Sequence, residues 1–297
     1  MAKRQRSQVE RYHDRVAGLY DTIYDGDPYW EVVFQITWRH LLRHFPKDMG
    51  TRCLDVGCGT GRWGMRFAKA GYRTDFLDIS RKMLDQVGGK LAALGRPRSD
   101  IFAMPGAPRP DLPDDSRPLL WHAALDDLSA LPSGAYGFIV WQGDPLNCAE
   151  KPGKAFREMA RLLAPGGVMA MSVDNRLQGI YHYFKDGDVK GLAEFLRTGK
   201  TNWITDDPEE RYRITMFTPG QIRAMCRERG LELVSLVGKT VLPLRRFRGL
   251  LDDPGKRAEL TRLEESLHAE EALFANAAHL EFIARKPERH VSRQFDA

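Results

Sequence analysis

The chain is poor in cysteine and contains no long apolar run. Its four cysteines have no C-x-x-C spacing and no nearby histidine pair, so we expect reduced thiols, no metal site and no disulfide framework. No apolar run approaches the roughly 18 residues that a membrane span requires. The basic N-terminal residues are followed by no apolar segment, which argues against a secretory signal. We therefore expect a cytoplasmic protein without a membrane partner.

Positively and negatively charged residues are nearly balanced. Forty-five Lys and Arg stand against 40 Asp and Glu, which gives a net charge of +5. The basic residues are spread out, and the densest clusters are Lys3-Arg4-Arg6 and Arg245-Arg246-Arg248. A solvated basic face explains this distribution better than a nucleic-acid partner does. With 42% hydrophobic residues in 297, the chain has enough apolar material for one large domain with a cap.

The most informative stretch runs from Cys53 to Gly64. A short apolar run ends in three glycines at alternate positions (57, 59 and 61), and a helical pattern follows. Glycine tolerates positive φ and has no Cβ, so a ligand can approach the backbone closely. The free N–H groups of the helix N-terminus then face that ligand. A second predicted strand, residues 73–79, brings Asp78 to its tip, where a carboxylate can accept hydrogen bonds from both hydroxyls of a ribose.

Two motifs carry a resemblance to a known family. L-D-V-G-C-G-T-G followed by L-D-I-S resembles the class I S-adenosylmethionine (SAM) dependent methyltransferases of the small-molecule type. A-R-L-L-A-P-G-G-V, residues 160–168, resembles the element that precedes the fifth strand in that superfamily. The resemblance covers roughly residues 12–90 and 118–286. It implies an α/β fold with a Rossmann-like, seven-stranded, mostly parallel sheet flanked by helices, in which the last strand (279–286) is antiparallel.

The resemblance also suggests how the chain is organised. We expect an N-terminal helical lid (1–45), a SAM-binding core (46–174), a substrate-cap insertion after the fifth strand (175–217) and a C-terminal part of the core with a helical cap element (218–297). Residues 95–118, rich in proline and glycine, depart from the family pattern, and we interpret them as an irregular surface insertion.

SAM is the implied cofactor, and the resemblance places its contacts on the lid and on the loops that follow the strands. Ile79 is expected on the adenine face, and Asp126 at the adenine amino group, because Ala124 stands where the family has its usual acidic residue. Tyrosines can bind a carboxylate through the hydroxyl and a sulfonium through the ring face, although the alternative that they only pack the helix against the sheet stays open. The expected cofactor contacts are Tyr12, Tyr20, Asp55, Gly57, Cys58, Gly59, Gly61, Asp78, Ile79, Leu125, Asp126, Trp141 and Gln142.

The loop after the fourth predicted strand, Gln142 to Cys148, lies where open α/β sheets place their chemistry. Its D-P-L-N sequence departs at two positions from the tetrad of amino-group methyltransferases and is closer to the G-P-L-S loop of small-molecule enzymes, with Asn147 at the serine position. His182 and His13 are the best histidine candidates, although we interpret both as bystanders. The residues expected to position the reacting groups are Asn147, Tyr24, Tyr181 and Tyr183.

Methyl transfer requires mainly alignment of the reacting atoms, and a general base only if the acceptor still holds its proton. We expect a small-molecule acceptor and a monomer or homodimer. Because no clear base is evident, a SAM-consuming cyclase that resembles azetidine-2-carboxylate synthases and releases methylthioadenosine is an alternative. A nucleic-acid or protein methyltransferase and a non-catalytic SAM-binding protein are further alternatives, and the sequence leaves them open.

Overall fold

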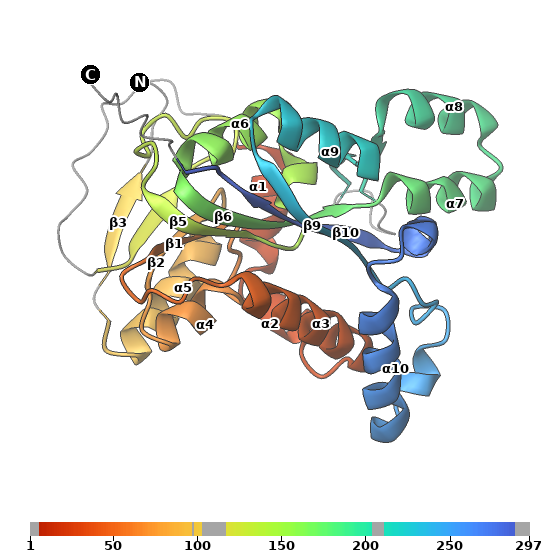
Figure 1. The fold of residues 1–297 in the computed structure, drawn as a ribbon, viewed down its shortest axis with the longest axis horizontal. Coiled ribbons are helices and arrows are strands. Elements are labelled where there is room, and N and C mark those ends of the chain that lie inside the picture. Colours follow the sequence, from red (N-terminus) through yellow and green to blue (C-terminus); the bar gives the residue numbers. More distant parts are fainter. Residues whose placement is uncertain (1–5, 97, 103–116, 204–210, 289–297) are drawn as a thin grey trace, which may run out of the picture.

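One mixed sheet forms the centre of the molecule (Figure 1). The computed structural model describes residues 6–96, 98–102, 117–203 and 211–288. Within them, the sheet has eight strands in the order β3-β4-β2-β1-β5-β6-β10-β9. In chain order the strands are β1 (Arg52–Val56), β2 (Arg73–Asp78), β3 (Ser99–Phe102), β4 (Leu119–His122), β5 (Tyr136–Trp141), β6 (Leu163–Asp174), β9 (Glu232–Lys239) and β10 (His279–Arg285).

The directions of the strands match the expected fold. Neighbouring strands from β3 to β6 all pair in parallel, whereas β10 pairs antiparallel with both β6 and β9. β9 therefore points the same way as the parallel strands. The prediction of a mostly parallel α/β sheet with an antiparallel last strand is confirmed. As a result, the carboxyl ends of the parallel strands and the first residue of β10 share one edge of the sheet, called the carboxyl edge below.

The strand count and one segment need correction. The sheet has eight strands where seven were expected, and the additional one, β3, lies within the stretch 95–118 that was expected to be irregular. The four residues S-D-I-F contain neither proline nor glycine, so they can pair in parallel with β4. Arg81 and Arg98 both bind Asp100 of this strand, at 2.8 and 3.0 Å. Residues 103–116 lie outside the described part of the chain.

Helices cover both faces of the sheet. Side chains alternate along β5: Phe138 and Val140 pack with α3 and α4, whereas Ile139 and Trp141 pack with α6 and α9. The sheet is therefore buried on both sides, as Figure 1 shows. The α-helices of the described residues are α1 (Gln8–Val16), α2 (Tyr20–Tyr24), α3 (Pro28–His44), α4 (Gly64–Lys69), α5 (Arg81–Ala93), α6 (Pro152–Leu162), α7 (Arg176–Asp186), α8 (Val189–Thr198), α9 (Pro219–Glu228) and α10 (Pro254–Leu267).

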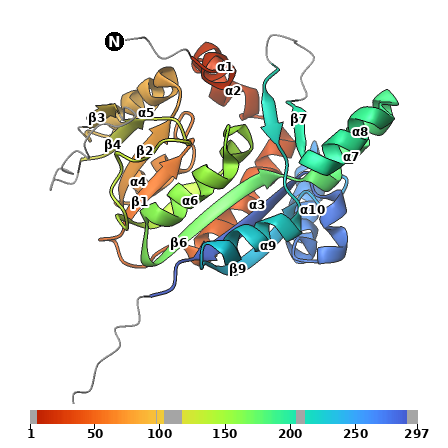
Figure 2. The same cartoon turned by 90° about the horizontal axis from the view of Figure 1, so that it is seen from above.

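Two peripheral units meet beside the carboxyl edge (Figure 2). The first is α1 with α2, residues 8–24, called the lid below. The second, residues 175–217, contains α7, α8 and a two-stranded sheet of β7 (Lys200–Asn202) and β8 (Arg213–Thr215). Tyr12 of the lid packs against Trp203 of the second unit, with ring centroids 5.2 Å apart. The lid and the second unit, called the insertion below, therefore contact each other.

Candidate active site

The turn between β1 and α4 is built on three glycines. Gly57, Gly59 and Gly61 have φ angles of 58°, 52° and 84°, in the left-handed region that favours glycine. A Cβ atom on Gly57 would lie 2.5 Å from the side chain of Pro145, in the loop after β5. The turn predicted from the sequence is therefore present, and it packs tightly against the loop that follows β5.

Two buried carboxylates hold this turn. Asp78, at the end of β2, accepts hydrogen bonds from the backbone N–H groups of Gly59 and Ser80, both at 2.8 Å. Asp55 accepts from the N–H of Gly64 at 2.7 Å. Burial raises the pKa of Asp55 to about 7 and also raises the pKa of Asp78, which the charge of His13 partly opposes. Asp78 thus lies at the expected strand end, and its contact with a ribose stays a prediction.

The lid places aromatic side chains over the glycine turn. A Cβ atom on Gly59 would lie 3.5 Å from the ring of Tyr20. The rings of Tyr20 and Tyr24 are 5.2 Å apart, and burial is the largest cause that raises the pKa of both hydroxyls. The ring of Tyr20 therefore lies against the motif and that of Tyr24 packs beside it, while the roles expected for the two residues stay predictions.

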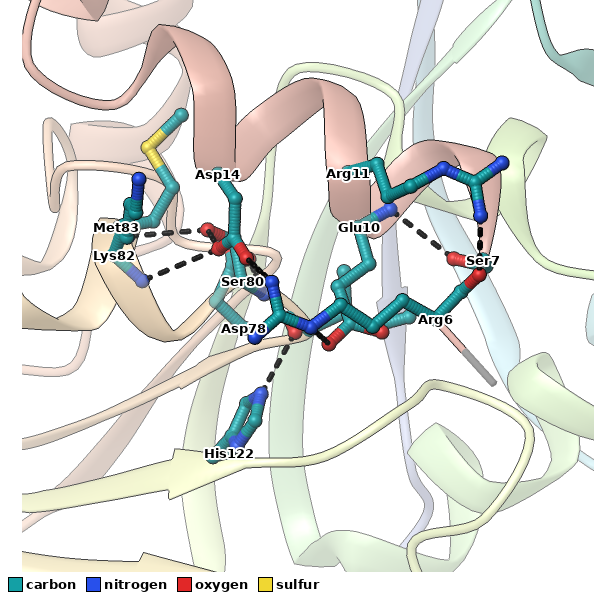
Figure 3. A network of polar contacts seen from close by, with 11 residues as sticks. Arg6, Ser7, Glu10, Arg11, Asp14, Asp78, Ser80, Lys82, Met83 and His122 are labelled. Atoms are coloured by element: carbon teal, nitrogen blue, oxygen red, sulfur yellow. Dashed lines mark hydrogen bonds and ion pairs between the residues drawn. The ribbon is translucent and has the colours of Figure 1, made fainter. Parts of the chain in front are cut away.

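Polar contacts fasten the lid to the core (Figure 3). Asp14 of α1 accepts hydrogen bonds from the Ser80 hydroxyl at 2.6 Å and from the Lys82 N–H at 3.4 Å. Asp21 of α2 accepts from the Thr60 hydroxyl, inside the glycine turn, and from Lys90 at 2.7 Å. The contacts reach both the turn and the start of α5, so the lid is held at two points on either side of Asp78.

A cluster of two carboxylates and one imidazole lies at the carboxyl edge of β5, β6 and β10. Nδ1 of His279 is 2.7 Å from Oδ2 of Asp144 and 3.2 Å from Oδ1 of Asp174. Burial by itself would lower the pKa of His279, but the two carboxylates outweigh it and raise that pKa to about 10. Burial would raise the pKa of Asp144, but the positive charges of His279 and Lys239 lower it to about 2. Asp144, Asp174 and His279 are called the acid–histidine cluster below.

Asn147 borders this cluster, and its expected role in positioning the reacting groups stays a prediction. Its side-chain oxygen accepts from the backbone N–H of Asp174 at 3.3 Å, and the residue is 1% exposed. Gln142 lies nearby and accepts from Lys239 at 3.1 Å, and Lys239 pairs with Glu281 at 3.1 Å. This part of the carboxyl edge is thus lined by charged and amide groups from distant parts of the chain.

The sequence analysis missed Asp174, His279, Lys239 and Glu281. One available signal could have found His279. The last predicted strand (β10) is expected to lie antiparallel beside the fifth predicted strand (β6). The first residue of β10 should then lie opposite the last residue of β6, and the structure pairs His279 with Asp174.

Three further expected contacts are engaged with other parts of the protein, and their role in binding SAM stays a prediction. Trp141, the last residue of β5, is fully buried in the core. Both carboxylate oxygens of Asp126 accept backbone hydrogen bonds, from Glu150 at 3.1 Å and Lys151 at 3.0 Å, and they brace the loop before α6. Leu125 is half-buried and packs against the core beneath this loop.

Ile79 and Cys58 lie next to the expected site. Ile79 is half-buried at the end of β2, and its carbonyl lies 2.9 Å from Nε2 of His122. Cys58 is 7% exposed inside the glycine turn, and burial raises the pKa of its thiol. Tyr12 contributes to the aromatic contact between the lid and the insertion. The positions of these three residues are compatible with the expected cofactor contacts, which stay predictions.

The two tyrosines expected from the insertion have different surroundings. Tyr181 is 62% exposed on α7. The hydroxyl of Tyr183 donates to Thr201 at 2.9 Å, and its ring stacks on Phe195 at 5.0 Å. Tyr183 also belongs to an apolar cluster that contains Tyr12 and Cys148. The role of both tyrosines in positioning the reacting groups stays a prediction.

Comparison with known proteins identifies the family. A family model described as a methyltransferase domain matches residues 29–236. The ubiquinone biosynthesis O-methyltransferase of Aromatoleum aromaticum is 24% identical, over 75% of this chain and 79% of its own length. The enzyme of the same name from Chromobacterium violaceum is 28% identical, over 69% of this chain and 74% of its own length.

A solved structure shares the fold. The CcbJ methyltransferase from Streptomyces caelestis aligns with a TM-score of 0.54 at 17% identity, over 93% of this chain and 98% of that one. Among the helices of the described residues, none is sufficiently long and apolar to cross a membrane. Because the family model covers more than half of the chain, the protein belongs to the methyltransferase-domain family and is a class I SAM-dependent methyltransferase.

Proposed function

We propose that this enzyme methylates a hydroxyl oxygen of a small molecule held between the lid and the acid–histidine cluster. The lid carries the proposal, because it is fastened over the glycine turn by Asp14 and Asp21. A site covered by the lid suits an acceptor that is small enough to be enclosed. The names of the two relatives, both ubiquinone biosynthesis O-methyltransferases, support oxygen as the methylated atom.

The residues of the first half of the site fit SAM. The three glycines of the turn have no Cβ atoms, so SAM can approach the backbone closely, and Asp78 would provide a carboxylate for the ribose hydroxyls. When bound, SAM supplies an electrophilic methyl group on a sulfonium centre. The rings of Tyr20 and Tyr24 would shield that centre from water and favour its positive charge through their faces.

The second half of the site would hold the acceptor. Asp144, Asp174 and Asn147 offer oxygen atoms that can accept a hydrogen bond from a hydroxyl group. Asp174 and His279 come from strand ends, which are rigid parts of the sheet, and Asn147 is held by the backbone of Asp174. A fixed set of this kind suits a reaction in which the protein contributes mainly alignment.

The SAM-consuming cyclase is not favoured by the comparisons. Its case from the sequence rested on Asn147 together with Tyr181 and Tyr183, and the 62% exposure of Tyr181 gives little support to a site that must shield the sulfonium from water. A macromolecular acceptor is also less well supported, because a long polymer would have to displace the lid.

The proposal is tested by incubating the enzyme with SAM and a panel of small phenols, catechols and hydroxy acids. Formation of S-adenosylhomocysteine and of an acceptor heavier by one methylene should be followed by mass spectrometry. We expect turnover with hydroxyl compounds and none with their O-methylated counterparts. Methylthioadenosine formed from SAM alone, or turnover only with nucleic acid or protein, would overturn the proposal.

A further inference from the structure

We propose that the acid–histidine cluster binds a divalent transition-metal ion, and that this ion holds the acceptor hydroxyl. The ligands would be Asp144, Asp174 and His279, which come from the loop after β5, the end of β6 and the start of β10. The part of the proposal that concerns the acceptor rests on the proposed methyl transfer. The binding of the ion itself does not, so the two can fail separately.

The spacing of the donor atoms matches that of ligands around one ion. Nδ1 of His279 lies 2.7 Å from the nearest oxygen of Asp144 and 3.2 Å from that of Asp174, and the three residues offer donor atoms all within 4.8 Å of one another. Neighbouring ligands on an ion with bonds of about 2.1 Å are themselves about 3 Å apart. The side chains would therefore need only a small adjustment to share an ion, and three protein ligands leave positions open for an acceptor.

The charges of the cluster also favour a dication. The side chains of Asp144, Asp174 and His279 are 14%, 23% and 19% exposed, so two carboxylates and one imidazole are largely removed from water. Lys239 forms an ion pair with Glu281 at 3.1 Å, and its charge also acts on Asp144. With the three carboxylates ionised and the imidazole protonated, the cluster together with this pair still carries one negative charge in excess, which is costly in a buried site. An ion of charge +2 would balance both carboxylates.

Unpaired buried polar atoms beside the cluster point independently to a ligand. Asn147 is 1% exposed, and its oxygen is fixed by the N–H of Asp174. Its Nδ2 atom is inaccessible to water and has no hydrogen-bond partner among the described residues, and the same holds for Oδ1 of Asp144. Buried polar groups are normally satisfied. A metal ion would bind Oδ1 of Asp144 directly. A water or an acceptor oxygen bound to that ion would accept a hydrogen bond from Nδ2 of Asn147.

The donor set selects the kind of ion. Two carboxylates with one imidazole suit Mn²⁺, Fe²⁺ or Zn²⁺, whereas Mg²⁺ and Ca²⁺ prefer oxygen ligands alone. Asn175, which follows Asp174, is not available as a further ligand, because its amide nitrogen donates to the carbonyls of Phe274 and Ala277 at 2.6 and 2.8 Å. Its oxygen accepts from the N–H of Leu177 at 3.1 Å.

The ion would serve the proposed reaction by lowering the pKa of the acceptor hydroxyl. The hydroxyl proton would leave to water, the acceptor oxygen would form the new O–C bond, and the C–S bond of SAM would break. This would supply the activation that a general base otherwise provides, for which the sequence showed no clear candidate.

The test uses the full chain, stripped with EDTA and titrated with MnCl₂. Free Mn²⁺ is followed by electron paramagnetic resonance, and bound Mn²⁺ by the electron spin-echo modulation that a ligating imidazole nitrogen causes. We expect one class of tight site with an imidazole signal, and Mn²⁺ affinity at least 10-fold weaker in H279Q and D174N. D127N, which removes an exposed carboxylate that binds Ser129 outside the cluster, should leave the affinity unchanged.

The outcomes separate the two proposals. No Mn²⁺ binding at millimolar concentration, a bound ion without the imidazole signal, or equal affinity in D127N, D174N and H279Q overturns the metal site. The imidazole signal is measured on the wild-type chain, so a variant that fails to fold does not affect that result. If Mn²⁺ binds with this signal but no hydroxyl compound is methylated, the metal site stands and the proposed acceptor class fails.

Discussion

Asp78 and Asp75 offer a direct test of the cofactor site, because they lie on the same strand but have different hydrogen-bond partners. Asp78 faces the carboxyl edge and accepts from the N–H groups of Gly59 and Ser80. Asp75 is completely buried and accepts from Arg52 at 2.8 Å, from the Leu119 N–H and from a tyrosine hydroxyl. Both carboxylates support the fold, but only Asp78 lies at the carboxyl edge, where the SAM site is predicted.

The expected effects follow from these contacts. In D78N the side chain keeps one acceptor oxygen of two and loses its charge, so a ribose hydroxyl loses a charge-assisted partner. A hydrogen bond to a charged group contributes about 1.5–3 kcal/mol, which corresponds to a dissociation constant for SAM that is about 10- to 150-fold higher. In D75N the buried Arg52 loses its charged partner, which costs about 3–5 kcal/mol of unfolding free energy. SAM affinity of the folded D75N protein should stay within about 2-fold of wild type.

The assay is isothermal titration calorimetry with SAM and S-adenosylhomocysteine, alongside urea denaturation of each variant. Denaturation reports the loss of stability separately, so a weaker complex is not mistaken for unfolded protein. If D78N binds SAM as tightly as wild type, the proposed cofactor orientation is wrong. If D75N weakens binding as much as D78N, the effect of both comes through the sheet and Asp78 has no direct role.

The remaining predictions concern the lid and the glycine turn. D21N should leave Lys90 without its ion pair and raise the rate of SAM release roughly 2- to 10-fold in stopped-flow fluorescence, consistent with a contribution of about 0.5–1.5 kcal/mol from a half-exposed contact. G57A should lower the melting temperature and abolish SAM binding, because its Cβ would lie 2.5 Å from Pro145 at a φ of 58°; unchanged binding would contradict the turn geometry. Burial raises the pKa of Asp55 to about 7, so the native state keeps a proton that the unfolded chain releases near pH 4. The stability that this proton provides is fully present below pH 4 and is lost as pH rises through 7, on the order of 4 kcal/mol; D55N, whose amide oxygen can still accept from the helix, should show a flatter unfolding free energy between pH 5 and 8 in urea titrations.

The parts of the fold that could be predicted from the sequence are those encoded by neighbouring residues. The glycine turn, the acidic end of β2 and the helix Pro28–His44 each depend on local patterns, and the structure contains all of them. Asp27 illustrates this, since its side chain accepts from the N–H of Tyr29 at 2.8 Å and caps the helix where the D-P pair predicts its start. β3 was not predicted from the sequence, because a four-residue edge strand is too short to show periodicity and is stabilised by its pairing with β4.

The two halves of the site differ for the same reason. Most of the residues expected to hold SAM fall within a short span from Asp55 to Ile79, where one motif encodes both the residue types and their geometry. The acid–histidine cluster joins Asp144, Asp174 and His279, which become neighbours only through the register of β10 against β6. A substitution in that cluster leaves the SAM motif intact, so acceptor choice can change without loss of the cofactor. It follows that variants of His279 should alter turnover and acceptor range while SAM affinity stays near that of the wild type, and a parallel loss of both would show that the two halves are coupled.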